Sequence, residues 1–230
     1  MVLLMLFLAT AVLLLLGVVG PVFTADNTTP ASPRFGRLTE QIIGQGHGKF
    51  YETTSRGNMF SGYATALTAS TANSTAPGLT LYNPLSSGKR LALTKFGYGQ
   101  DAVSTNKLGT GTLFHCIYSL NGPTATQSGI IPTGTPVIPT NTDIGAALNS
   151  AANLLSTATL NAAPKLLYPA INKSEVTVGT IGGNSQPNWE DMDGLIVLEQ
   201  GAGWCTNSIA AAGTTPAEQI GVAWEEIQPG

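Results

Sequence analysis

Short apolar runs separated by turn residues dominate the chain from about residue 47 onward. The runs mix β-branched and aromatic residues, and Gly, Pro, Asn and Ser lie between them, which is the pattern of strands and turns. The predicted strands span 78–84, 90–99, 111–120, 176–181, 194–204 and 221–227. Many short strands spaced by turn signals predict a mainly β fold, an antiparallel β-sandwich or jelly roll.

The clearest strand–turn–strand pattern lies between residues 78 and 99. Asn83-Pro84 and Gly88 interrupt it, and these residue types favour a turn over a continuous strand. The side chains predicted to enter the core from the two strands are Leu79, Leu81, Leu91 and Leu93.

Two segments depart from the strand pattern. Apolar residues recur at helical spacing at Ile144, Leu148 and Leu155, so the sequence predicts one short helix near 143–156. The alternative is a Thr/Ala-rich loop that leads into a strand from Leu160 to Tyr168. Residues 121–142 hold four prolines and no clear period, which predicts a long connection that crosses or caps the sandwich rather than sitting within a sheet.

The N-terminus, residues 1–24, is apolar, and the sequence predicts a helix there. Residues 2–23 carry no charge and are long enough to cross a bilayer core of about 30 Å. A membrane anchor or uncleaved signal, a cleaved secretory signal, an arm buried in an assembly and sequence added by an upstream start codon all stay open. A cleaved signal is less favoured, because no Lys or Arg precedes the run. Residues 25–46 then form a polar linker or arm, and 47–230 the β-sandwich domain.

Charge content narrows the classes of function. Only 10% of the 230 residues are charged, less than half of the roughly 25% typical of soluble domains. The chain has 10 Lys+Arg against 13 Asp+Glu, and apart from Lys89-Arg90 the basic residues are scattered. No basic stripe is present to neutralise a run of phosphates, so nucleic-acid binding is disfavoured. The low charge also excludes a long coiled coil or a charged helical bundle.

Cys116 and Cys205 are the only two cysteines. Each lies in a predicted strand, so one long-range disulfide and two buried thiols are both compatible with the sequence. His115 precedes Cys116, but neighbouring side chains of a strand point to opposite faces. This alternation argues against a metal site shared by the two residues.

Motifs for catalysis are incomplete. The Gly-Lys pairs in GQGHGKF (44–50) and PLSSGKRL (84–91) lack the first Gly and the Ser or Thr of a phosphate-binding loop. The acidic turn 189–194 does not fit a calcium-binding EF-hand register. A hydrolase would need two converging carboxylates, and the candidate suppliers are Glu190, Asp191, Glu199 and Glu225. With two histidines and no Gly-x-Ser-x-Gly elbow, the sequence favours a non-enzymatic protein without catalytic, cofactor-binding or metal-binding residues.

The tryptophans are predicted to be core or interface anchors rather than ligand-stacking residues. They are Trp189, Trp204 and Trp224.

Three phrases occur in order along the chain: HGKFYETTSRGNMFSG (47–62), LTLYNPLSSGKRLALTKFGYG (79–99) and GVAWEEI (221–227). This set resembles a group of largely uncharacterised structural proteins of tailed bacteriophages. The resemblance implies a virion component, such as a capsid decoration protein, a head fibre or a tail protein, built mainly of β-sandwich. It further implies a homo-oligomer, expected to be a trimer, whose other partners are the major capsid or tail protein. It assigns no catalytic residue, and the apolar N-terminus departs from it.

The leading functional hypothesis is therefore a non-enzymatic structural protein located in a phage or virus particle. The alternative is a membrane-anchored or secreted surface module that binds glycans or another cell-surface partner, for which residues 2–23 would be the membrane contact. That alternative predicts an exposed aromatic groove. A hydrolase with a β-jelly-roll body is a third hypothesis.

Overall fold

The computed structural model describes residues 49–100, 111–120, 132–173, 188–210 and 217–228, together with four short N-terminal strands. These strands are β1 (Val22–Thr24), β2 (Asn27–Ala31), β3 (Arg34–Phe35) and β4 (Gln41–Ile42); β1 pairs with β2 and β3 with β4. The chain divides into two compact units, Met1–Glu52 and Thr53–Gly230. The predicted apolar helix spans residues 1–24, of which 1–21 lie outside the described residues. Much of the predicted linker and the predicted strand 176–181 also lie outside them. Within the part of the chain that is described, no helix is both long and apolar enough to span a membrane.

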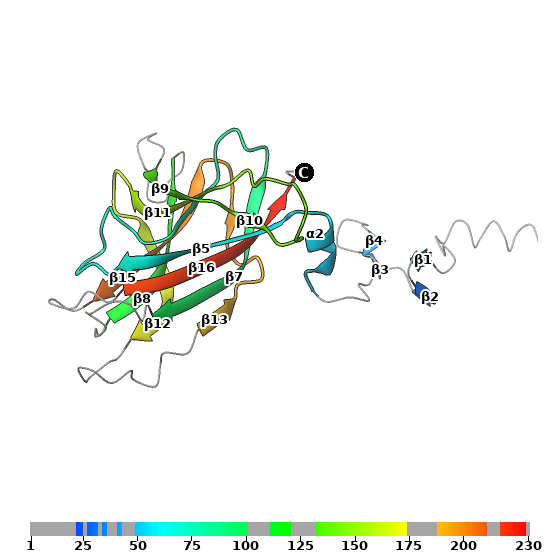
Figure 1. The fold of residues 1–230 in the computed structure, drawn as a ribbon, viewed down its shortest axis with the longest axis horizontal. Helices are drawn as coiled ribbons and strands as arrows, with labels where there is room; N and C mark the ends of the chain where they lie inside the picture. Colours follow the sequence, from blue (N-terminus) through cyan, green and yellow to red (C-terminus); the bar gives the residue numbers. More distant parts are fainter. Residues whose placement is uncertain are drawn as a thin grey trace, which may run out of the picture. The chain divides into compact units, whose positions relative to one another are not determined.

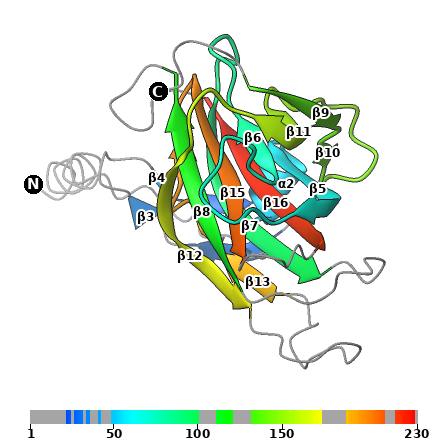
Figure 2. The same cartoon turned by 90° about the vertical axis from the view of Figure 1, so that its left-hand side faces the viewer.

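The unit Thr53–Gly230 contains two antiparallel sheets, which confirms the mainly β prediction and matches a β-sandwich (Figure 1, Figure 2). The first, here called the β16 sheet, has the order β10 (Thr140–Asn141), β5 (Met59–Thr68), β16 (Ala217–Ile227), β7 (Arg90–Gln100) and β13 (Asn188–Asp191), with β14 (Val197–Leu198) also paired to β7. The second, the β15 sheet, has the order β12 (Lys165–Lys173), β8 (Gly111–Ser119), β15 (Ala202–Ala210), β6 (Thr80–Tyr82), β11 (Asn153–Thr159) and β9 (Thr133–Val137). A short helix, α2 (Tyr51–Ser55), precedes β5.

The chain crosses from one sheet to the other at nearly every connection. Strands β5, β7, β13 and β16 lie in the β16 sheet, whereas β6, β8, β12 and β15 lie in the β15 sheet. The predicted turn at Asn83-Pro84 therefore joins strands of different sheets rather than a hairpin. Asn83 fixes this crossing, because its side-chain amide donates to the carbonyl oxygens of Lys89 (2.8 Å) and Leu198 (3.0 Å). Gly88 has a φ of 63°, a conformation that favours glycine.

The main core lies between the two sheets. Strand β16 shows why: its residues alternate between buried and half-buried positions, with Ile220, Val222 and Trp224 facing the core. Trp224 stacks on Phe60 at a ring-centroid distance of 6.2 Å. The four leucines predicted for the core are all fully buried: Leu79, Leu81, Leu91 and Leu93.

A second apolar cluster covers the outer face of the β15 sheet. Tyr82 and Tyr118 stack there at 6.5 Å, beside both cysteines and Leu160. The segment carrying Leu160 is held in place by a bond from its backbone N–H to the Thr75 carbonyl (2.8 Å). The sandwich is therefore asymmetric, since loops cover the outside of the β15 sheet, while large aromatic side chains on the outside of the β16 sheet remain exposed.

The predicted helix near 143–156 is wrong. Residues 153–159 form β11, which pairs with both β6 and β9, so each side of its backbone is bonded to a strand. Ile144 and Leu148 are 86% and 52% exposed and form no buried helical face with Leu155. Three apolar residues at helical spacing are weak evidence for a helix. Pairing with β6 on one side and β9 on the other determines that residues 153–159 form a strand. The alternative strand from Leu160 also begins too early, because β12 starts at Lys165.

The proline-rich segment 121–142 belongs partly to the sheets, contrary to the prediction. Its described part forms β9 and β10, which are edge strands of the two sheets. Pro136 is tolerated in β9 because an edge strand leaves one row of backbone groups unpaired. The link from β9 to β10 carries the chain from the β15 sheet to the β16 sheet, so this part of the segment does cross the sandwich.

Candidate functional site

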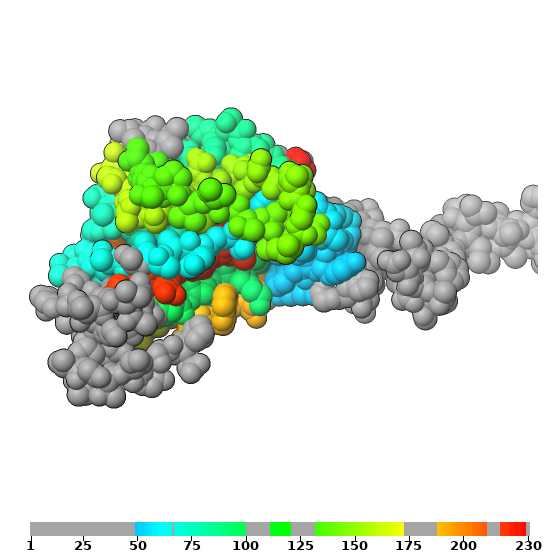
Figure 3. Space-filling view, viewed as in Figure 1, coloured from blue at the N-terminus to red at the C-terminus, as the bar shows by residue number. Residues whose placement is uncertain are grey.

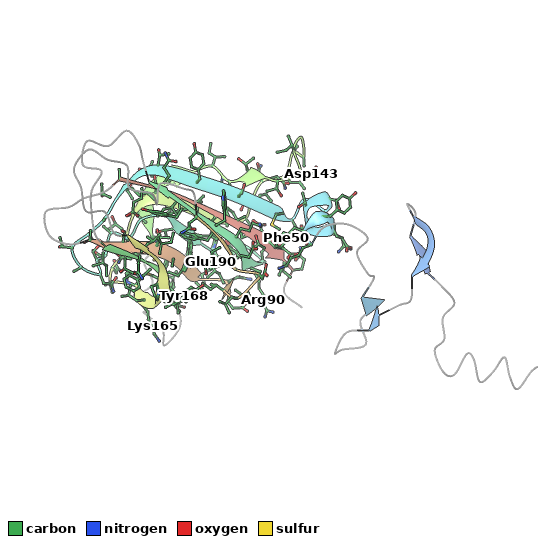
Figure 4. The ribbon with its side chains drawn as sticks, turned by 90° about the horizontal axis from the view of Figure 1, so that it is seen from below. Phe50, Arg90, Asp143, Lys165, Tyr168 and Glu190 are labelled. Carbon is green, nitrogen blue, oxygen red and sulfur yellow. The ribbon has the colours of Figure 1, made fainter. Side chains whose placement is uncertain are left out.

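His115 is fully buried and is the centre of a polar cluster between the sheets. Figure 4 labels two other members of the cluster, Tyr168 and Glu190. Its Nε2 lies 2.9 Å from Glu190 Oε2, and its Nδ1 accepts a hydrogen bond from Trp204 Nε1 at 3.1 Å. Tyr168 Oη donates to Glu190 Oε1 at 3.5 Å, and Phe96 packs edge-on against the imidazole at 4.6 Å. The cluster thus connects β13 of one sheet to β8, β12 and β15 of the other.

The partners of His115 determine its protonation state. An indole N–H can only donate, so Nδ1 carries no proton and Nε2–H donates to the Glu190 carboxylate. Burial lowers the pKa of His115 below its ordinary value of 6.5, although the hydrogen bond and the charge of Glu190 oppose this shift. The lone pair that a general base needs is already occupied by Trp204. We therefore interpret the cluster as a packing element between the sheets.

Sequence reasoning missed this cluster. Its four polar and aromatic members, residues 115, 168, 190 and 204, come from four strands and share no local motif. The one available signal was strand alternation, which puts His115 on the same face as the buried Leu113.

The two cysteines lie directly opposite each other on β8 and β15, facing away from His115. Both are fully buried, and both are free thiols in the structure. Burial, followed by the hydrogen bond and charge of Cys116, raises the pKa of Cys205 well above its ordinary value. These properties are those of small apolar residues rather than of reactive or metal-binding thiols.

We expect neither thiol to react with a thiol reagent in the folded protein. The reactive species is the thiolate, which burial disfavours at Cys205, and neither sulfur is reached by solvent. In denaturant without reductant, both cysteines of the chain should react. A count of zero thiols after denaturation would instead show that a disulfide had formed. Mass spectrometry after alkylation makes the measurement.

The four candidate carboxylates each have a different partner. Glu190 binds His115, Asp191 pairs with Lys95 Nζ at 3.1 Å, and Glu199 pairs with Arg90 Nε at 2.9 Å. Glu225 accepts from Thr53 Oγ1 at 3.3 Å, while the adjacent Glu226 faces the other way and accepts from Ser150 Oγ at 2.6 Å. The described part of the chain contains no group of three His, Cys, Asp or Glu side chains arranged to hold a metal ion.

The tryptophans divide into two kinds. Trp204 and Trp224 are fully buried core residues, as predicted. Trp189 is 72% exposed, so it is not a core residue, and its prediction as an interface anchor stays a prediction. It lies on edge strand β13, where adjacent side chains alternate: Glu190 turns inward to His115 and Trp189 turns outward.

Trp189 forms one wall of a shallow groove on the outer face of the β16 sheet. A single row crosses four strands: Tyr63 on β5 is opposite Gly221 on β16, Gly221 is opposite Gly97 on β7, and Gly97 is opposite Trp189. Tyr63 is 65% exposed. In Figure 3, which views this face, the red surface of β16 lies between cyan β5 and green β7. The groove has a volume of about 450 Å³, and a hollow of about 180 Å³ adjoins it along the same row.

The glycine floor sets the position of the indole. A Cβ built at Gly97 would lie 2.7 Å from Trp189 Cζ3 and 3.0 Å from Cε3, so the six-membered ring rests on Gly97. A Cβ at Gly221 would lie 3.4 Å from Tyr63 Cβ, so any larger residue would narrow the groove.

Polar groups border the groove along the strands. The next row on the same face contains Ser61, Ala223, Lys95 and Asp191, with Thr140 beyond Ser61. On the opposite side, Gln219 lies beside Gly99. Because Lys95 and Asp191 form an ion pair, the charges of this border balance.

Comparison with known proteins gives no identification. No family model, no curated protein and no solved structure matches this chain. Functional conclusions therefore depend on the residues of the chain itself.

The surface-module alternative predicts an exposed aromatic groove, but sequence reasoning did not identify the residues that form this one. Tyr63 and the glycines were not singled out, and Trp189 was assigned as an anchor. A signal was available in FGYGQ (96–100), where glycines at alternate positions indicate a strand face left open for close approach.

Proposed function

We propose that this chain is a non-enzymatic structural protein of a virus particle, of the tailed-bacteriophage type. It would self-associate as a homotrimer and dock on a capsid or tail lattice. The observation that carries the proposal is the strand order. Eight strands run β5-β16-β7-β13 in one sheet and β6-β15-β8-β12 in the other. We interpret this order as a double-sheet jelly roll, with β9–β11 inserted, a fold used by viral capsid and lectin domains.

The positions of the sequence phrases support the resemblance to phage structural proteins. The phrase 47–62 covers α2 and the start of β5, 79–99 covers β6 and β7, and 221–227 ends β16. Strands β5, β16 and β7 are direct neighbours, so residues far apart in the sequence pack as one unit in the centre of a sheet.

Apolar side chains at one end of the β16 sheet support self-association. This is the end of the sheet where β5 and β7 begin and where β16 ends. Strand β14 and the segment that follows β10 lie next to this end. The exposed apolar residues here are Leu85, Ile144, Leu148, Leu195, Val197 and Ile227, with exposures from 39% to 86%. Gathered apolar residues of this kind are typical of subunit interfaces.

Light scattering coupled to size exclusion tests this proposal on the full chain. The expected mass is three times 23.7 kDa, about 71 kDa. The double variant Ile144→Ser/Leu148→Ser should shift the mass toward 23.7 kDa, since both side chains are exposed in one chain and would be buried between chains. Tyr63→Ser, an equally exposed site on the groove, is the matched control and should leave the mass unchanged.

Two results would contradict the virion role. One is a wild-type chain that remains monomeric. The other is recovery of the chain only from detergent-extracted membranes and never from particles of the virus that encodes it, as measured by mass spectrometry of purified particles.

A second candidate function is a membrane-anchored or secreted surface module that binds glycans. The observation that favours it is the groove between the exposed Tyr63 and Trp189. A hydrolase is not proposed, because the candidate carboxylates bind different partners instead of one another.

A further inference from the structure

We infer that the groove between Tyr63 and Trp189 is a binding site for an uncharged carbohydrate, with a sugar ring lying over Gly221, beside the indole that covers Gly97. The inference does not rest on the virion role, because a particle protein and a surface module could each carry such a site. The shape of the groove, the polar groups on its border and the strands that form it all fit such a ligand.

The floor and walls suit a flat ligand with C–H groups on its faces. Tyr63 on β5 and Gly97 on β7 are two strand spacings apart, roughly 10 Å. Between them lies only Gly221, and the indole of Trp189 covers Gly97. The faces of aromatic rings are electron-rich, so they attract the weakly positive C–H groups of a sugar ring. The volume of about 450 Å³ lies within the usual range of small-ligand sites.

The border supplies the hydrogen-bonding groups that hydroxyls require. Lys95 donates and Asp191 accepts at one side, with side-chain exposures of 46% and 65%. Ser61 and Thr140 extend the same row, and Gln219 lies at the other side. Each sugar hydroxyl is both a donor and an acceptor, so a mixed border fits it better than a border of one type.

The same features count against other ligand classes. Lys95 is paired with Asp191, so the groove presents no excess positive charge for a phosphate or sulfate. Strands β16 and β7, which form the floor, have a neighbour on each side, so their backbone is already bonded and cannot accept an added peptide strand. A proline-rich peptide, which also uses aromatic grooves, is the competing occupant that the test must separate.

Intrinsic fluorescence reports directly on this site. Of the three tryptophans, two are fully buried and only Trp189 is exposed. Acrylamide should therefore quench Trp189 selectively in the folded full chain. A bound sugar should protect that fluorescence and shift its emission.

The experiment titrates the full chain with cellobiose, lactose, N,N′-diacetylchitobiose and mannobiose, with decaproline as the peptide probe. At least one sugar should give a saturable change, with a Kd on the order of 1 mM or tighter. Calorimetry should show that Trp189→Ala and Tyr63→Ala each raise the Kd for that sugar by at least about tenfold. Gly97→Val should do the same while both aromatic residues remain, because its side chain would displace the indole.

Leu195→Ala is the matched control. Leu195 is 73% exposed and Trp189 is 72% exposed, so the two side chains are equally accessible. Leu195 lies at the apolar end of the β16 sheet rather than in the groove, so its replacement should leave the sugar affinity unchanged. Circular dichroism checks that each variant is folded. The inference is overturned if no sugar gives a saturable change, if binding is unaffected by Trp189→Ala, or if decaproline alone binds in a Trp189-dependent way. Light scattering on the same samples measures self-association separately, so failure of the sugar site and failure of the virion role are distinguishable.

Discussion

Replacing Trp224 by alanine is expected to lower the free energy of unfolding by about 3–5 kcal/mol. Trp224 is fully buried at the centre of the β16 sheet and stacks on Phe60 at 6.2 Å. Truncation removes this apolar area from the core and leaves a cavity that surrounding strands, bonded on both sides, fill only in part. Urea unfolding followed by circular dichroism measures the change.

Two further variants sharpen this prediction. Trp224 Nε1 has no hydrogen-bond partner among the described residues, so the indole stabilises the core through its apolar area. Trp224→Phe should therefore cost clearly less than Trp224→Ala. Trp189→Ala, on the exposed groove, should change the free energy of unfolding by less than about 1 kcal/mol. Equal losses for Trp189→Ala and Trp224→Ala would contradict the assignment of the two residues to surface and core.

Lowering the pH from 6.5 to 5 is expected to destabilise the protein through His115. Burial lowers the folded-state pKa of His115 below the ordinary value of 6.5. As the pH falls below 6.5, the unfolded chain therefore takes up a proton at this histidine before the folded chain does. Because the unfolded state then binds more protons, the free energy of unfolding falls as the pH falls, by no more than about 1.4 kcal/mol per pH unit. Well above pH 6.5, where His115 is deprotonated in both states, this contribution no longer changes with pH.

The hydrogen bond from Trp204 provides the test of mechanism. Trp204→Phe removes the donor to Nδ1, which can then take up a proton beside the Glu190 carboxylate. Compared with the wild-type chain, the Trp204→Phe variant should have a lower free energy of unfolding at pH 7. Its free energy of unfolding should also depend less on pH between 6.5 and 5. A His47→Ala background leaves His115 as the only histidine. An identical pH slope with and without Trp204 would show that this hydrogen bond does not set the protonation of His115.

Much of the fold could be predicted from the chain because strand alternation is a local property. Leu79, Leu81, Leu91 and Leu93 were predicted to enter the core and are fully buried. The turn at Asn83-Pro84 was predicted from residue types that disfavour a continuous strand, and the structure places the break there. The same local rule placed Cys116 and His115 on opposite faces, where the structure has them.

The errors share a cause. Ile144 and Leu148 suggested a helical face, but the space between β6 and β9 required a strand at 153–159. For Trp189 the sequence left core and interface both open, and its position on edge strand β13 decided that it is exposed rather than in the core. In each case the outcome depended on which strands lie alongside, which a short stretch of sequence does not contain.

The sequence by itself determined the fold class, the turn at Asn83-Pro84, the low charge and the inward-facing Leu79, Leu81, Leu91 and Leu93, because these depend on residue type and on a period of two. Only the tertiary structure decided the strand order, the His115–Glu190–Trp204 cluster and the groove between Tyr63 and Trp189. The row from Tyr63 to Trp189 joins residues more than a hundred positions apart through three strand pairings. A register shift of one residue in any of these pairings would turn its side chains to the other face, so the groove exists only once all three registers are set.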